Sequence, residues 1–314
     1  MKKLTLNYKK LSTCIIYLSL IFLAIYLYKK DIISIPQNLD YRYVLFSIIL
    51  LFLGQIIHGM QFRVILKRYG FFISPLDSLR AYGLNVFSRY VPGKVWVFLG
   101  PVSYVKGKYG YPLDSLLTVS LSSQFISLWI GLTLSMIVLF LTKISLIIRL
   151  LCIITWIGLT LVVFTRYIHN LVQWFFLKLI KKTINIPQIS IKKCISTFPI
   201  YILEWSFISL GFFTLCRSFG IIPNLIALFA YPIASIISML IVFIPGGLGV
   251  REGILVMLLM QSGITAQLAT TISVTSRLWA LLGEAFIFLI GLILKIYNKN
   301  PLPLTDPTIN NIRR

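Results

Sequence analysis

Acidic side chains are scarce in this sequence, which has 8 Asp and Glu residues among 314. General acid–base catalysis depends on carboxylates and histidines held in a fixed arrangement, and the chain has only 2 His. It also lacks the GxSxG, HExxH, GxxxxGK[ST] and paired DxD motifs of common enzyme classes. These absences argue against an ordinary soluble enzyme, and we predict no catalytic residues.

Cysteine and histidine show no metal-binding pattern. The four cysteines, Cys14, Cys152, Cys194 and Cys216, lie far apart, with neither CxxC nor Cys/His ligand spacing. We therefore predict that they are packing residues, and that the protein holds no metal and no cofactor. His58 lies alone in an apolar stretch and is predicted to form a hydrogen bond between helices.

Hydropathy and charge indicate a membrane protein. Hydrophobic residues make up 58% of the sequence and charged residues only 12%, and the mean hydropathy is +0.91. Lys and Arg number 30, which gives a net charge of +22. The basic residues are scattered between apolar stretches, so they favour cytoplasmic loops that follow the positive-inside rule over a nucleic-acid-binding surface.

A membrane-spanning helix needs about 20 apolar residues. Six stretches meet this length with some tolerance: 11–28, 43–63, 115–141, 147–165, 195–216 and 268–294. The first follows the basic segment MKKLTLNYKK, and no small-residue cleavage site comes after it. We therefore predict a retained first span rather than a signal peptide.

Two further apolar regions are interrupted by proline and glycine. Region 79–105 contains SRYVPGKVW, and region 224–262 contains FIPGGLGVREG. Proline removes a helix donor and glycine relaxes the backbone, so each region is predicted to form two short half-helices joined inside the membrane. The predicted fold is an all-α integral membrane protein, a polytopic helical bundle with six full spans and two re-entrant hairpins.

The distribution of Lys and Arg predicts that both termini are cytoplasmic, with 301–314 as a cytoplasmic tail. This requires that the first hairpin enters the membrane from the cytoplasm and the second from outside. Six basic residues contradict this orientation because it places them at the outer side: Lys29, Lys30, Arg42, Lys143, Arg149 and Arg217. The aromatic and basic stretch 167–193 fits either an interfacial helix on anionic lipid or an ordinary basic loop.

An internal repeat relates two halves of a single domain that covers 1–314. The VPG that begins at 91 and the IPG that begins at 244 lie 153 positions apart, and the same offset aligns TVSLSSQ with TISVTSR. The predicted halves, about 1–145 and 146–300, run in opposite directions through the membrane. Inverted repeats with broken helices are how many secondary transporters build a site near the bilayer midplane. The alternative is a chance match, since these residue types are common in spans.

Ionisable side chains at membrane depth are functional candidates because burying their charge in lipid is costly. A helix N-terminus offers free N–H groups and a positive dipole end, and glycines let a ligand approach the backbone. We therefore predict a site for an anionic lipid headgroup at the two hairpins. Its candidate residues are Arg89, Pro92, Gly93, Lys94, Pro245, Gly246, Gly247, Gly249, Arg251, Glu252 and Arg277.

Some of these residues also fit a structural role. Arg251 with Glu252, or Arg277 with Glu284, could form buried ion pairs that hold the hairpins in place. Glu204 and Glu284 are candidates either for proton coupling or for a hydrogen-bonded scaffold. The residues alone leave these alternatives open.

IPGGLGVREG at 244–253, VPGK at 91–94 and RLWALLGE at 277–284 resemble the lysylphosphatidylglycerol synthase transmembrane-region family, also called the flippase-like domain family. The resemblance covers nearly the whole chain and implies a multi-pass protein of the bacterial inner membrane. The best understood members flip an aminoacylated phosphatidylglycerol made by their own C-terminal synthase domain. No such domain follows the last span here, so we expect no aminoacyl transfer.

The match to PGGLGVRE carries over residue by residue to Pro245, Gly246, Gly247, Gly249, Arg251 and Glu252. By contrast, the helix after the first break often carries an acidic and then a basic residue in this family. Here Gln124 and Phe125 stand in the comparable region, which puts a charge-coupled mechanism in the first half in doubt.

The resemblance implies a lipid translocase that moves an anionic phospholipid, a glycolipid or a polyprenyl-phosphate-linked substrate across the cytoplasmic membrane. Two alternatives stay open: a non-transporting partner that presents lipid to a cell-envelope glycosyltransferase, and a membrane-embedded transferase. The expected partners are the lipid substrate, anionic lipid at the cytoplasmic face and, in the first alternative, that glycosyltransferase. No nucleic-acid partner is expected.

Overall fold

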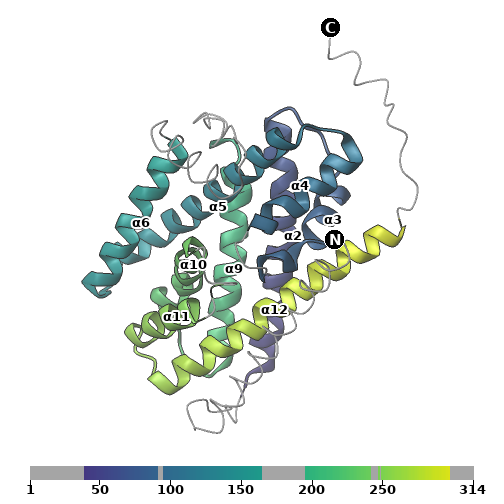
Figure 1. Cartoon of the computed structure of the whole chain (residues 1–314). Helices are drawn as coiled ribbons and strands as arrows, with labels where there is room; N and C mark the ends of the chain where they lie inside the picture. Colours follow the sequence, from purple (N-terminus) through teal and green to yellow (C-terminus); the bar gives the residue numbers. More distant parts are fainter. Residues whose placement is uncertain (1–38, 91–94, 165–194, 242–246, 248, 298–314) are drawn as a thin grey trace.

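A computed structural model describes residues 39–90, 95–164, 195–241, 247 and 249–297, and the regular elements in these ranges are all helices (Figure 1). In chain order they are α2 (Tyr41–Arg68), α3 (Pro75–Gly83), the 3₁₀-helix η1 (Val86–Tyr90), α4 (Val95–Tyr109), α5 (Leu113–Leu141), α6 (Leu146–Phe164), α9 (Phe198–Ser218), α10 (Leu225–Leu240), α11 (Val250–Gln261) and α12 (Ala266–Tyr297). The predicted all-α class is confirmed.

Five of the described helices, α2, α5, α6, α9 and α12, are long and apolar enough to cross a membrane. They match five of the six predicted spans, and the sixth, 11–28, lies outside the described residues. The basic stretch 167–193 and the tail 301–314 lie outside them as well. Large apolar side chains such as Phe140 and Ile154 are exposed on the outer helix faces, as a lipid environment favours. The chain is therefore a multi-pass membrane protein.

Neither interrupted apolar region forms one continuous helix. The first contains α3, η1 and α4, and the second contains α10 and α11. Beside the second break, Gly247 and Gly249 have φ angles of +65° and +79°, a backbone conformation that favours glycine. A Cβ atom on Gly247 would also lie 2.7 Å from that of Ser238. The break is confirmed, and the re-entrant placement of both regions in a membrane stays a prediction.

The helices α2 and α9, which the 153-residue offset places on each other, pack side by side in opposite directions. The backbone N–H of Asp40, before α2, donates to the carbonyl of Ser218 at the end of α9, at 3.0 Å. At the other end of the pair, Arg68 reaches the carbonyl of Ser196, before α9, at 3.5 Å. Equivalent helices that run antiparallel are what an inverted repeat predicts.

The remaining helices follow the same offset. Leu113, the first residue of α5, falls on Ala266, the first residue of α12. The packing is also exchanged between the halves: α3 packs on α12, and its counterpart α10 packs on α5. α6 has no counterpart among the described helices and lies at the edge of the bundle beside α5 (Figure 1). This arrangement supports the hypothesis that the two halves are an inverted repeat, and the division of the chain into these halves stays a prediction.

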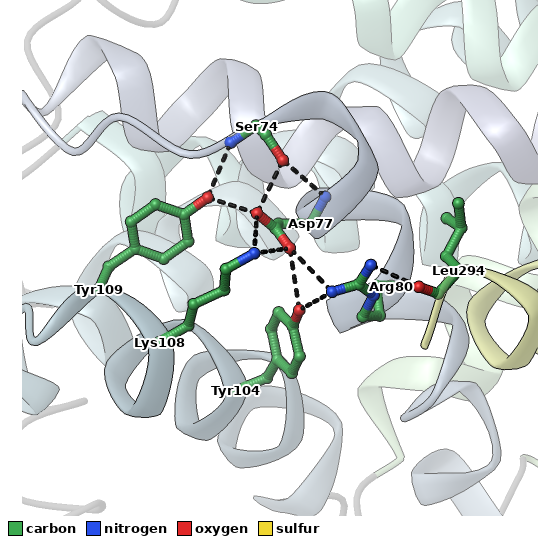
Figure 2. Close-up of polar contacts among 7 residues, drawn as sticks. All are labelled: Ser74, Asp77, Arg80, Tyr104, Lys108, Tyr109 and Leu294. Carbon is green, nitrogen blue, oxygen red and sulfur yellow. Dashed lines mark hydrogen bonds and ion pairs between the residues drawn. The ribbon is translucent and has the colours of Figure 1, made fainter. Parts of the chain in front are cut away.

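A buried carboxylate joins the elements at one end of the first half (Figure 2). Asp77, on α3, accepts hydrogen bonds from Ser74, Tyr104 and Tyr109 at 2.5–2.9 Å and pairs with Lys108 Nζ at 2.7 Å. Burial by itself would raise the pKa of Asp77, but these donors outweigh it and lower the pKa to about 2. The carboxylate is therefore ionised and ties α3 to α4.

Arg80 extends this cluster to the last helix. Its guanidinium lies 3.3 Å from Asp77, and Nη1 donates to the hydroxyl of Tyr104 at 2.8 Å. Nη2 donates to the carbonyl of Leu294 on α12 at 2.5 Å (Figure 2). The cluster thus holds α3 and α4 against the C-terminal part of α12.

Candidate functional site

A cavity of about 250 Å³ with a cluster of charged side chains lies between the two predicted halves. It is lined by α2, α3, η1, α4 and α5 from the first half and by α9, α10, α11 and α12 from the second. Its charged or titratable lining residues are His58, Tyr82, Arg89, Tyr90, Glu204, Tyr231, Arg251, Arg277 and Glu284. The cavity is slightly smaller than typical pockets for drug-sized ligands, so its size suits a headgroup rather than a whole lipid.

Glu284 of α12 is held by residues of η1. Arg89 Nη1 donates to its carboxylate at 3.1 Å, and the hydroxyl of Tyr90 donates at 2.9 Å. Arg89 is fixed in turn, because Nε donates to the carbonyl of Val86 at 3.2 Å and Nη2 lies 3.1 Å from the hydroxyl of Tyr82. This ion pair joins the broken region of the first half to the last helix of the second.

A double-mutant cycle tests the pair of Arg89 and Glu284. Each single change to glutamine should lower the free energy of unfolding by about 2 kcal/mol, because it leaves the other charge in the cavity without its partner. This value lies between those of exposed and buried pairs, since the Arg89 side chain is 34% exposed. The double variant should lose less than the sum of the two, measured by denaturation in detergent. Additive losses would contradict the pairing.

Glu204 of α9 is the second cavity carboxylate. It bonds to His58 Nδ1 and Gln61 Nε2, both on α2, and to the hydroxyl of Ser127 on α5 at 3.3 Å. The prediction that His58 forms a hydrogen bond between helices is therefore confirmed.

Tyr82 lies between the groups that bind Glu284 and those that bind Glu204. Its hydroxyl donates to the side-chain carbonyl of Gln55 at 3.0 Å and accepts from Arg89. Its ring lies 4.6 Å from the ring of His58, centroid to centroid. A continuous series of contacts therefore runs from Glu284 through Arg89, Tyr82 and His58 to Glu204.

Glu252 is the common partner of two arginines. Arg251 lies 3.4 Å and Arg277 lies 3.7 Å from its carboxylate. The predicted pair of Arg251 and Glu252 is confirmed. Sequence spacing also suggested an ion pair between Arg277 and Glu284. The structure instead pairs Glu284 with residues of η1 and places Arg277 beside Glu252.

Glu252 bonds back to the residue that precedes α11. The backbone N–H of Gly249 donates to the carboxylate of Glu252 at 2.8 Å, and glycine has no side chain to cap the helix in return. This bond occupies the N–H of the residue that precedes the helix, and the prediction that an anion binds at this helix end stays a prediction.

Arg251 retains a donor that no described group accepts. The residue is 7% exposed and lines the cavity. Nη1 lies 3.2 Å from the hydroxyl of Tyr231, and the guanidinium lies 5.2 Å from the centre of that ring. Nε has no hydrogen-bond acceptor within the described part of the chain, whereas Nη2, which makes no hydrogen bond there, is the atom that pairs with Glu252 at 3.4 Å. A buried donor without an acceptor costs free energy, and an anionic ligand that accepts its hydrogen bond would remove that cost.

Sequence reasoning found the charged cavity residues and missed the neutral ones. Tyr82, Gln61, Ser127 and Tyr231 all bond to a charged side chain of the cavity. Polar residues of these types are common in spanning helices, so only Gln61, an amide inside an apolar stretch, carried a usable signal. Pro92, Gly93, Lys94, Pro245 and Gly246 lie outside the described residues.

Comparison with known protein families matches residues 11–291 to the family described as the lysylphosphatidylglycerol synthase TM region. The chain belongs to this family. No curated protein and no solved structure matches it. The matched residues, 11–291, include every residue that lines the cavity. Membership indicates a membrane protein of lipid biosynthesis or translocation.

Proposed function

We propose that the protein is a lipid translocase of the bacterial cytoplasmic membrane. Its cavity binds the anionic headgroup of a phospholipid, a glycolipid or a polyprenyl-phosphate-linked lipid. The observation that carries this proposal is Arg251, a buried cation that lines a cavity inside a bundle of span-length helices and whose Nε has no acceptor among the described residues.

The lining itself contains more cations than anions. Three arginines and two glutamates give it a formal charge of +1 when His58 is neutral, and Glu252, outside the lining, pairs with two of those arginines. Glu284 already has Arg89 and Tyr90 as partners, so the unsatisfied Nε donor of Arg251 is the best placed to bind phosphate oxygens. A phosphate is also the chemical group shared by the proposed phospholipid and polyprenyl-phosphate substrates.

The placement of the cavity suits alternating access. Both predicted halves contribute to its wall, and their equivalent helices α2 and α9 run in opposite directions. In transporters built from inverted repeats, such a central site is exposed to one side of the membrane and then to the other. The apolar chains of the lipid would stay between the helices and the bilayer while the headgroup crosses.

Lipid movement in proteoliposomes tests the proposal. Fluorescent phospholipid and polyprenyl-phosphate probes are compared for the native chain, Arg251→Gln and the control Arg42→Gln, which changes an exposed arginine at the start of α2. Arg251→Gln should slow movement at least about tenfold, because it removes a charge-assisted hydrogen bond worth about 1.5–3 kcal/mol. Arg42→Gln should match the native chain.

Equal rates in a folded Arg251→Gln protein would overturn the assignment of the site. No movement of any probe by the native chain would overturn the translocase proposal and favour a protein that presents lipid to a partner enzyme. Thermal melting and size-exclusion chromatography in detergent establish that each variant is folded.

A further inference from the structure

Glu204 differs in its partner from the other carboxylates that form ion pairs inside the described bundle. Within the described ranges, Asp77, Glu252 and Glu284 each pair with lysine or arginine, whereas the ion-pair partner of Glu204 is His58. Glu204 is 6% exposed, and its other hydrogen bonds come from the neutral groups of Gln61 and Ser127. Its charge is therefore balanced only when His58 carries a proton.

We propose that His58 and Glu204 form a proton-binding site whose occupancy is coupled to the anionic ligand. This inference rests on the proposed function, since it concerns the same cavity. Lysine and arginine are cations throughout the physiological pH range, but an imidazole ordinarily gains or loses its proton between about pH 5 and pH 8. With the proton the pair has no net charge, and without it the pair carries one negative charge.

The remaining ionisable groups of the cavity do not provide such a site. Tyr82 from α3, Tyr90 from η1 and Tyr231 from α10 are phenols, which ordinarily ionise near pH 10. The cavity side chains of α5 are neutral. The charged groups are Arg89 from η1, Arg251 from α11, and Arg277 and Glu284 from α12. Glu284 is paired with Arg89, which leaves the pair of His58 and Glu204 as the proposed site that changes charge.

Protonation of this pair changes how the cavity attracts an anion. The formal charge of the lining rises from +1 to +2 when the proton binds. Like any pair of linked ligands, the proton and the anion then raise each other's affinity by the same factor. If both are bound when the cavity changes the side to which it opens, the lipid and the proton cross the membrane in the same direction.

Binding of short-chain phosphatidylglycerol to the purified full chain in detergent tests the coupling without requiring transport. The headgroup phosphate keeps its charge between pH 5.5 and pH 8, so a change in affinity reports on the protein. The native chain should bind about tenfold more tightly at pH 5.5 than at pH 8, because the proton and the anion raise each other's affinity by the same factor. In weakly buffered solution, a pH indicator should show proton uptake when the lipid is added.

Two variants and a control make the result decisive. Glu204→Gln and His58→Gln should each abolish proton uptake and flatten the pH dependence. The control is Asp114→Asn, which changes an exposed carboxylate in the first turn of α5 and should behave like the native chain. His58→Gln serves alone if Glu204→Gln does not fold. Binding without proton uptake, or a pH dependence unchanged in the folded variants, overturns the coupling and leaves the translocase intact. Failure of the native chain to bind or move any lipid overturns the proposed function itself.

Discussion

Replacing Asp77 with asparagine should lower the free energy of unfolding by about 3 kcal/mol. The carboxylate is buried among Lys108, Arg80 and three hydroxyl donors (Figure 2), and removing its charge leaves the cations without their partner. We expect a loss at the low end of the range for breaking a buried ion pair, because the Lys108 side chain is 23% exposed and can be partly hydrated. Denaturation of the purified protein in detergent measures the loss.

The pH dependence of this loss identifies its cause. The donors hold the pKa of Asp77 at about 2 in the folded protein, against 3.8 as the ordinary value. Because the folded pKa is lowered, the stabilisation is present above pH 4 and is lost as the pH falls from about 4 to about 2. The native chain and Asp77→Asn should therefore become similarly stable at the acidic end. Asp114→Asn should change stability by less than about 0.5 kcal/mol. A difference that is constant with pH would contradict the electrostatic explanation.

The spans and the two breaks could be predicted from the sequence because both depend on local properties. A run of about 20 apolar residues is long enough to cross a bilayer wherever it occurs. Proline and glycine likewise disrupt a helix at their own positions. The five described spans and the divided regions that contain α3, α4, α10 and α11 follow from these two rules alone.

The partners of the cavity charges could not be predicted in the same way. Glu284 is 195 residues from Arg89, and Glu204 is 146 residues from His58. Local spacing instead suggested Arg277 for Glu284, since the two lie about two turns apart on one helix. The hydrogen bond from Gly249 to Glu252 did have a local signal, because Glu252 stands three residues after Gly249.

The packing of helices from one half on helices of the other limits how the cavity could open. Because α3 packs on α12 and α10 packs on α5, each predicted half presents its last helix to the other half. Arg80 adds a bond from α3 to the carbonyl of Leu294 on α12. A movement that pulled the sequence halves apart would have to break both contacts. We therefore expect α3 and α12 to move together, and α10 and α5 to move together.

Gly83→Ala is expected to lower the free energy of unfolding by about 3 kcal/mol, the upper end for added volume in a packed interior. A Cβ atom on Gly83 of α3 would lie 2.3 Å from the carbonyl oxygen of Ile287 and 3.2 Å from the Cα atom of Gly291, both on α12. These neighbours are backbone atoms, so the helices must separate to admit the methyl group. Denaturation in detergent measures this change as well.

Gly158→Ala is the matched control, because a Cβ atom on this glycine of α6 would meet nothing within 4 Å. It should be neutral or raise stability by up to about 1 kcal/mol, since alanine favours the helix over glycine. Equal effects of the two changes would contradict a tight crossing of α3 and α12. If the crossing is tight, Gly83→Ala should also slow lipid movement more than its stability loss explains, because the contact that keeps α3 and α12 together has been loosened.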